Sequence, residues 1–168
     1  MSETTQVVYN RADKVNFMGL ASDASTFYRM TGFTDNGNTL NANVYERRYV
    51  DEKSSRKTVT GYAKEIKYTL DRYTNNSVHD KIASVHEKEL TNVILPIITV
   101  DFNKPGSAAG TYYAIKRDYA IIPDTDGDGT DAYQYTGTFG ANGELVEGTA
   151  TVSADGKTCT FSSEVPSA

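Results

Sequence analysis

Alternating apolar and polar positions dominate the chain. Between residues 40 and 50, Leu40, Ala42 and Val44 fall on one side and mostly polar or tyrosine side chains on the other. A longer alternation of the same kind follows between residues 58 and 73. A period of two residues is typical of strands with one buried and one solvated face. We therefore expect two long antiparallel strands in this part of the chain.

One helix is predicted, over about residues 77–90. Asn76 or Ser77 supplies a candidate N-cap, and Asp80 follows Ser77 by three residues, as in a capping box. An apolar stripe at helical spacing comes next, formed by Val78, Ile82 and Val85.

Both histidines, His79 and His86, belong to this predicted helix but lie off its apolar stripe. They are seven residues apart, whereas a metal-binding pair on one helix face is usually four apart. We expect both to be ordinary surface residues.

Further strands are expected after the helix, over residues 93–102, 111–122, 132–139, 145–153 and 158–165. Asp155-Gly156 joins the last two and is a strong hairpin signal. Many strands with one helix indicate a mainly β fold, an antiparallel β-sandwich or a partly closed barrel with one flanking α-helix and a long hairpin loop. At 168 residues, the chain is expected to form a single domain over residues 1–168.

Composition favours packed sheets and protein contacts. The chain has 12 Tyr, 6 Phe and no Trp. Tyrosine at this density suits half-buried sheet faces and protein–protein contacts, although a β-rich core that favours tyrosine would look the same. From Asp118 onward there are nine acidic residues and one lysine, whereas the preceding part carries sixteen basic and thirteen acidic residues. Such an asymmetric chain can attract copies of itself, and ordinary surface charge is the alternative.

Export and membrane signals are not recognisable in the sequence. The first six residues are polar and do not resemble a secretory signal, and the apolar run 93–100 is broken by Pro96 and too short to span a bilayer. We expect synthesis in the cytoplasm. Cys159 is the single cysteine and lies in a strand-like run, which predicts a packed thiol.

The most chemically suggestive segment is 124–131, the Asp-rich turn. Its Asp124, Asp126 and Asp128 alternate like the first half of an EF-hand loop, but the twelfth position is Tyr135 instead of glutamate. These three aspartates are candidates for weak Ca²⁺ binding, with a solvated turn as the alternative. No other cofactor is expected. No phosphate loop, nucleophile elbow or zinc motif is present, so we do not expect an enzyme, although a carboxylate-pair hydrolase stays open.

Several stretches in a fixed order carry a resemblance to a known family. They are residues 18–23, 27–30, 45–52, 59–62, 119–123 and 147–151, with the predicted helix between the fourth and fifth. This order resembles the major tail tube proteins of long-tailed bacteriophages infecting Gram-positive bacteria, from about residue 15 to 161. The Asp-rich turn is not part of that pattern.

The resemblance implies a structural protein of the virion. Proteins of this family form hexameric rings that stack into the tail tube, the channel for DNA delivery. The implied partners are further copies of the chain, the tape measure and other tail proteins, and double-stranded DNA in transit without specific binding. No membrane insertion is implied.

Two sets of residues acquire roles under this resemblance. The loop over about residues 47–57 would reach an adjacent ring, with contacts from Arg47, Arg48, Tyr49, Lys53, Arg56 and Lys57. The solvated faces of the two predicted long strands would line the lumen, with the side chains of Asn41, Asn43, Glu65, Lys67, Thr69 and Asp71. A lining of mixed and weak charge is expected, because a channel for DNA should not bind the phosphates of the DNA tightly.

Two other functions remain open at this point. One is a β-sandwich binding module stabilised by Ca²⁺ at the Asp-rich turn. The other is a tube or terminator protein of a contractile tail or injection machine.

Overall fold

The computed structural model describes residues 4–164, and the chain divides into two compact units. The first, here called the barrel unit, comprises described residues up to 31 together with 95–118 and 144–164. The second, here called the hairpin unit, comprises residues 32–94 and 119–143. Strands β7 (Ile94–Pro105) and β8 (Thr111–Asp126) contribute to both units.

The barrel unit is a closed antiparallel barrel of six strands. A short 3-10 turn (Arg11–Asp13) precedes β1 (Lys14–Gly19), followed by β2 (Thr26–Arg29), β7, β8, β10 (Val146–Val152) and β11 (Thr158–Ser162). The hydrogen-bonded order is β10-β11-β2-β1-β7-β8, and β8 pairs with β10 to close the circle. Closure leaves no unpaired edge in the barrel wall.

Apolar side chains fill the inside of this barrel. Phe17, Phe27, Ile98, Val100, Ala114, Ala150 and Cys159 are buried together. Burial also raises the pKa of the Cys159 thiol to about 12, so this cysteine is neutral and packed, as its strand-like context predicts.

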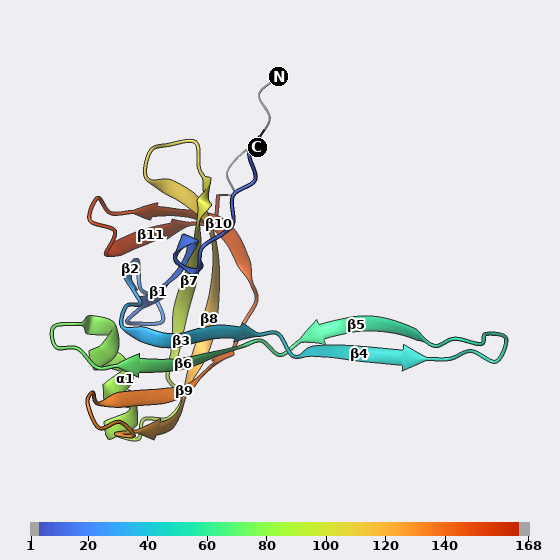
Figure 1. The fold of residues 1–168 in the computed structure, drawn as a ribbon, viewed down its shortest axis with the longest axis horizontal. Helices are drawn as coiled ribbons and strands as arrows, with labels where there is room; N and C mark the ends of the chain where they lie inside the picture. Colours follow the sequence, from blue (N-terminus) through green and yellow to red (C-terminus); the bar gives the residue numbers. More distant parts are fainter. Residues whose placement is uncertain (1–3, 165–168) are drawn as a thin grey trace. The chain divides into compact units, whose positions relative to one another are not determined.

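The hairpin unit contains a four-stranded sheet, one helix and a separate hairpin. Its sheet order is β8-β9-β6-β3, with β3 (Phe33–Thr39), β6 (Glu65–Asp71) and β9 (Gln134–Ala141). Helix α1 (Ser77–Glu87) lies beside β6 and β9, and β4 (Ala42–Arg47) and β5 (Arg56–Tyr62) pair only with each other and extend away from the sheet (Figure 1).

One face of the four-stranded sheet is buried with the helix. Ile66, Tyr68 and Leu70 of β6 are at most 1% exposed, as are Val78, Ile82 and Val85 of α1. The helix stripe predicted from the sequence therefore packs in the core. Asn76 is its N-cap, and its side-chain oxygen accepts hydrogen bonds from the amides of Val78 and His79 at 3.1 and 3.2 Å.

The mainly β fold with a barrel, a flanking helix and a long hairpin is confirmed. The strands expected after the helix correspond to β7 through β11, although the end of the last expected strand, at residue 165, lies outside the described residues. Over the part of the chain that the structure describes, no helix is long and apolar enough to cross a membrane.

The two long strands expected early in the chain are where the prediction is wrong. The run 40–50 has no buried face, because β4 is exposed along its whole length. The run 58–73 is two strands, β5 and β6, which belong to different sheets. Asn41 adopts a positive φ of 47° and its side-chain amide donates to the Ala63 carbonyl at 3.0 Å. This left-handed residue turns the chain out of the sheet, so the alternation continues without a core to pack on.

Candidate assembly surfaces

The face of the four-stranded sheet opposite the helix is uncovered and polar. Alternation along β6 points Glu65, Lys67, Thr69 and Asp71 away from the buried face, and all four are half-buried or exposed. Alternation along β9 likewise points Gln134, Thr136 and Thr138 away from the buried face. The register pairs Lys67 with Thr138 and Thr69 with Thr136, so these side chains form one surface, here called the polar face.

Hydrogen bonds within the polar face engage several of its side chains. The Gln134 amide donates to Asp71 at 2.8 Å, and the hydroxyl groups of Thr125 and Thr136 are 2.5 Å apart. Asp35 of β3 lies opposite Thr69 and joins this face, so Glu65, Asp71 and Asp35 are acidic here and Lys67 is basic. A surface with a small net negative charge and internally bonded polar groups has little affinity for phosphate.

The six residues expected in the lumen do not all lie on this face. Glu65, Lys67, Thr69 and Asp71 are together on β6, whereas Asn43 lies in β4 of the hairpin and Asn41 lies at the hairpin's base. Sequence alternation alone could not separate them, since both runs show the same period.

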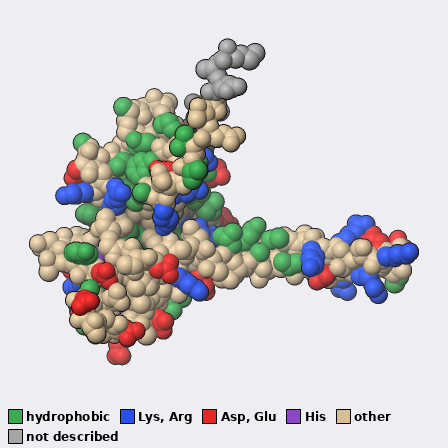
Figure 2. All heavy atoms as spheres, in the orientation of Figure 1, with side chains coloured by type: hydrophobic (Ala, Val, Ile, Leu, Met, Phe, Trp, Pro, Cys, Tyr) green, Lys and Arg blue, Asp and Glu red, His purple; other side chains and the backbone are tan. Residues whose placement is uncertain are grey.

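The hairpin tip, residues 47–57, carries five basic and two acidic residues, a net charge of +3. The predicted contact residues, Arg47, Arg48, Tyr49, Lys53, Arg56 and Lys57, are all exposed. Within the tip Arg56 forms an ion pair with Glu52, and Ser55 donates to Glu46 at 2.7 Å. The remaining cations are presented to solvent at the end of a narrow ribbon (Figure 2).

The stem of the hairpin presents apolar side chains to solvent. Val44, Val59 and Tyr62 are 54%, 50% and 59% exposed. Figure 2 shows hydrophobic side chains gathered where the hairpin leaves the sheet. The sequence pattern did not indicate this surface, because alternation predicts a buried face for Val44.

The Asp-rich turn joins β8 and β9. Its Asp124, Asp126 and Asp128 are exposed, and the Asp126 carboxylate accepts from the Tyr133 hydroxyl at 2.9 Å. Among the described residues, no group of three or more histidine, cysteine, aspartate or glutamate side chains is arranged to hold a metal ion. Weak Ca²⁺ binding by the three aspartates stays a prediction.

The side chains of both histidines are buried, which corrects the expectation of surface residues. His79 is fully buried, and its Nδ1 accepts from the Tyr73 amide at 3.0 Å. The His86 side chain is 2% exposed; its Nε2 lies 2.8 Å from the Tyr68 hydroxyl and its Nδ1 lies 3.5 Å from an Asp126 oxygen. A neutral imidazole with a partner on each nitrogen packs readily, which a count of apolar residues does not reveal.

His86 thus connects the helix to the Asp-rich turn. Burial lowers the pKa of His86, and the neighbouring Asp126 carboxylate opposes that shift. Burial also raises the pKa of Tyr68 well above its ordinary value, aided by the negative charge of Asp124. Tyr68 therefore stays protonated and acts as a hydrogen-bonding core residue that stacks on Phe139, with ring centroids 4.4 Å apart.

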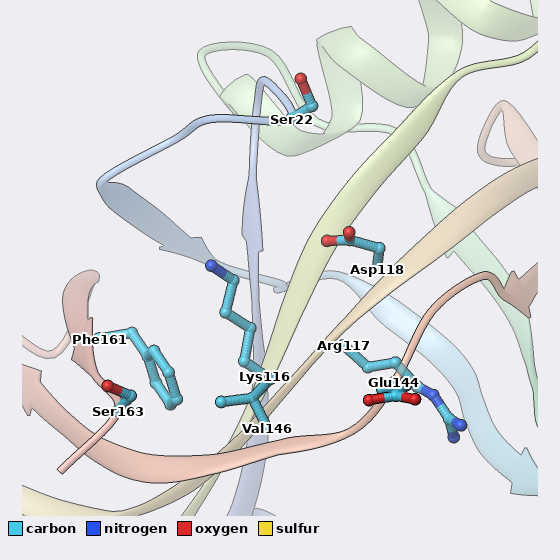
Figure 3. A pocket seen from close by; sticks show the side chains of 8 residues that line it. All are labelled: Ser22, Lys116, Arg117, Asp118, Glu144, Val146, Phe161 and Ser163. Atoms are coloured by element: carbon cyan, nitrogen blue, oxygen red, sulfur yellow. The ribbon is translucent and has the colours of Figure 1, made fainter.

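The barrel unit has an open pocket of about 440 Å³ (Figure 3). It is lined by Ser22, Lys116, Arg117, Asp118, Glu144, Val146, Phe161 and Ser163. The Lys116 ammonium lies 5.7 and 5.8 Å from the ring centroids of Phe27 and Phe161, so its charge is held by two aromatic faces. This pocket mixes both signs of charge and, among its described lining residues, holds no histidine or cysteine.

Comparisons with known proteins returned structures only. No family model matches the chain, and no curated protein matches it. One similar solved chain comes from the anti-feeding prophage baseplate, seen by six-fold symmetrised cryo-electron microscopy. It is 11% identical, with 86% of this chain and 97% of that chain covered and a TM-score of 0.49.

A second similar chain comes from the sheath-tube complex of the extracellular contractile injection system PVC, in its extended state. It is 13% identical, with 87% of this chain and 98% of that chain covered and a TM-score of 0.45. Both TM-scores are below 0.5, so we infer no function from either likeness.

Proposed function

We propose that this protein is a non-enzymatic structural subunit that assembles into stacked hexameric rings, the tail tube of a bacteriophage. The observation that carries the proposal is the combination found in the hairpin unit. A sheet with one uncovered polar face stands beside a hairpin whose stem and tip have no packing partner of their own. The order of sequence stretches that resembles tail tube proteins points in the same direction.

The polar face is suited to line a channel. We assign Glu65, Lys67, Thr69 and Asp71 to the lumen, with Asn41 and Asn43 near the base of the hairpin. Counterion release strengthens binding whenever a protein neutralises phosphates, so a channel that lets DNA slide should offer few cations. Lys67 is the one cation on this surface of β6.

Repetition of one subunit requires heterologous contacts, which close into rings or continue as a filament. The hairpin tip supplies such a contact if it reaches the next ring, as the family resemblance implies. Further copies of the chain, a tape measure protein and other tail proteins are then its partners, and double-stranded DNA passes through without specific binding.

Electron microscopy of the purified protein at high concentration tests this proposal. We expect tubes with a central channel, or six-membered rings that lengthen into tubes when initiating tail proteins are added. Single rings that never stack would instead identify a terminator. Monomers under every condition in which tails are stable would overturn the proposal and favour the Ca²⁺-stabilised binding module.

A further inference from the structure

The apolar side chains of the hairpin stem form one continuous face. The register pairs Ala42 with Tyr62 and Val44 with Val59 across the two strands, and a β-bulge between these two pairs accommodates the extra residue on β5, so that Val59 and Tyr62 share one face. Directly opposed residues point to the same side of a sheet, and alternation places Ala42 and Val44 on that side too. We call the surface of Ala42, Val44, Val59 and Tyr62 the stem face.

A two-stranded ribbon with such a face is not a stable end state. An isolated hairpin is marginal in water, and here β4 and β5 form ladder pairs only with each other. Both members of the Val44–Val59 pair keep at least half of their surface in water. Exposed apolar patches of this kind mark sites of protein contact.

Charge identifies the partner that covers the stem face. The hairpin leaves the sheet after Thr39 and returns before Glu65, whereas the Asp-rich turn lies at the other end of the same strands, next to Asp71. The tip carries a net charge of +3, and the Asp-rich turn carries four aspartates and no basic residue. The two complementary charges of the hairpin unit therefore sit at opposite ends of its strands.

Opposite and complementary ends favour head-to-tail contact between copies, because the tip of one copy can approach the turn of the next. We propose that the stem face is buried against a second copy of this chain, in a head-to-tail contact that brings the basic tip to that copy's Asp-rich turn. This inference rests on the self-assembly proposed above and adds which surfaces meet.

The two parts of this contact respond differently to salt. Ion pairs between the tip and the turn weaken as ionic strength rises, because exposed charges are screened. Burial of the stem face is apolar and persists in salt. Wild-type assembly should therefore weaken as salt is added without being lost. The assembly that persists at high salt should depend on Val44 and Val59.

The first experiment compares the double variant Val44→Ser/Val59→Ser with Leu145→Ser by sedimentation, at low and high salt. Leu145 is 45% exposed and lies just before β10, so its substitution removes exposed apolar area outside the hairpin. For the double variant we expect the concentration needed for half-assembly to rise at least about tenfold, most clearly at high salt, since two valines lose their burial. Leu145→Ser should assemble as wild type does.

Melting temperatures of both variants as monomers should match wild type, because all three positions are exposed. If the double variant assembles as wild type does at every ionic strength, the inference about the stem face is wrong. The proposal that the protein forms a tube would not be affected. Wild-type protein that never assembles would overturn both proposals.

A charge exchange tests the head-to-tail pairing separately. One chain carries Lys53→Glu, Arg56→Glu and Lys57→Glu, which change the net charge of the tip from +3 to −3. Another carries Asp124→Lys, Asp128→Lys and Asp131→Lys, which change the net charge of the turn from −4 to +2; Asp126 is left intact because it contacts His86. Each chain alone should fail to stack, and an equimolar mixture should stack again. A mixture that fails as each chain does alone would overturn the pairing of tip with turn.

Discussion

Single residues in the core of the hairpin unit depend on close polar contacts. His86 lies between the Tyr68 hydroxyl on one side and Asp126 on the other, with the Tyr135 ring edge-on at a centroid distance of 5.0 Å. Its neighbour in sequence, Glu87, accepts from the Tyr135 hydroxyl at 2.8 Å. A single imidazole thus ties the helix to the sheet and to the Asp-rich turn.

Stability should fall in mild acid because of His86. Burial lowers its pKa below the ordinary value of 6.5, so the unfolded chain binds this proton more readily than the folded one. The contribution of neutral His86 to the free energy of unfolding is fully present above a pH of about 6.5 and is lost as the pH falls through the folded-state pKa. The free energy of unfolding should then fall by at most about 1.4 kcal/mol per pH unit. Urea unfolding between pH 7.5 and 5 measures this slope.

The control for this experiment is His86→Gln, which keeps a polar side chain and removes the titrating group. Its unfolding free energy should change less with pH over the same range. Identical slopes for wild type and variant would show that His86 does not titrate on folding.

At the scale of elements, hydrophobic patterning predicted the helix and the strands from β7 to β11, because each of these contributes buried side chains to a core. It failed at β4 and β5, whose alternation is equally regular although neither face is buried. The strands β1 to β3 were not assigned as such. Burial in β1 is nearly continuous, and β3 is largely polar, so neither shows a clean alternation.

Some of the candidate surfaces could be predicted from local sequence patterns, and others could not. The face of β6 was predictable from local alternation, and the exposed tip was predictable because residues 51–57 include no apolar side chain. Burial of His79 and His86 depends on partners far along the chain, such as Tyr68 and Asp126, which no local pattern contains. The stem face became visible only when the register of β4 with β5 was known.

Helix α1 should depend on its cap. The Asn76 side chain satisfies two amides of the first turn, which otherwise have no partner within the helix. We expect Asn76→Ala to lower the free energy of unfolding by about 1 kcal/mol, and Asn76→Asp to cost much less because aspartate caps equally well. Denaturant unfolding of the two variants checks this. Equal losses for alanine and aspartate would mean that the side-chain oxygen does not act as a cap.

The whole molecule is asymmetric in charge. Its hairpin tip is basic, whereas the segment from Asp118 onward carries nine acidic residues and one lysine. In an assembly of identical copies such a distribution sets one orientation of each subunit toward the next. Exposed ion pairs are individually weak, but in the hexameric ring proposed here six copies of each contact would act together.

Neutralising the tip should weaken stacking without unfolding the subunit. For Lys53→Ser, Arg56→Ser and Lys57→Ser together, we expect an unchanged monomer and shorter tubes, since each exposed pair contributes only about 0.2–1 kcal/mol but is repeated around the ring. Wild-type stacking should itself weaken with added salt. Tube length by electron microscopy and sedimentation at several ionic strengths give the measurement.

A matched control removes the same charge elsewhere, with Lys14→Ser, Lys81→Ser and Lys88→Ser. These positions lie outside the hairpin, so tube length should stay close to wild type. If the tip variant stacks like wild type at every salt concentration, stacking depends on the apolar residues and backbone of the hairpin.

Closure of the barrel has a consequence for how the chain is made. Strand β11, at the end of the described chain, lies between β10 and β2, so it joins the last part of the chain to the first. A ribosome releases β2 long before β11 exists. Until residues 158–162 emerge, β2 and β10 each present an open edge, and the wall cannot close. Synthesis through residue 162 therefore precedes completion of the barrel, and any chain cut short before Thr158 keeps two unpaired strand edges that can pair with other chains.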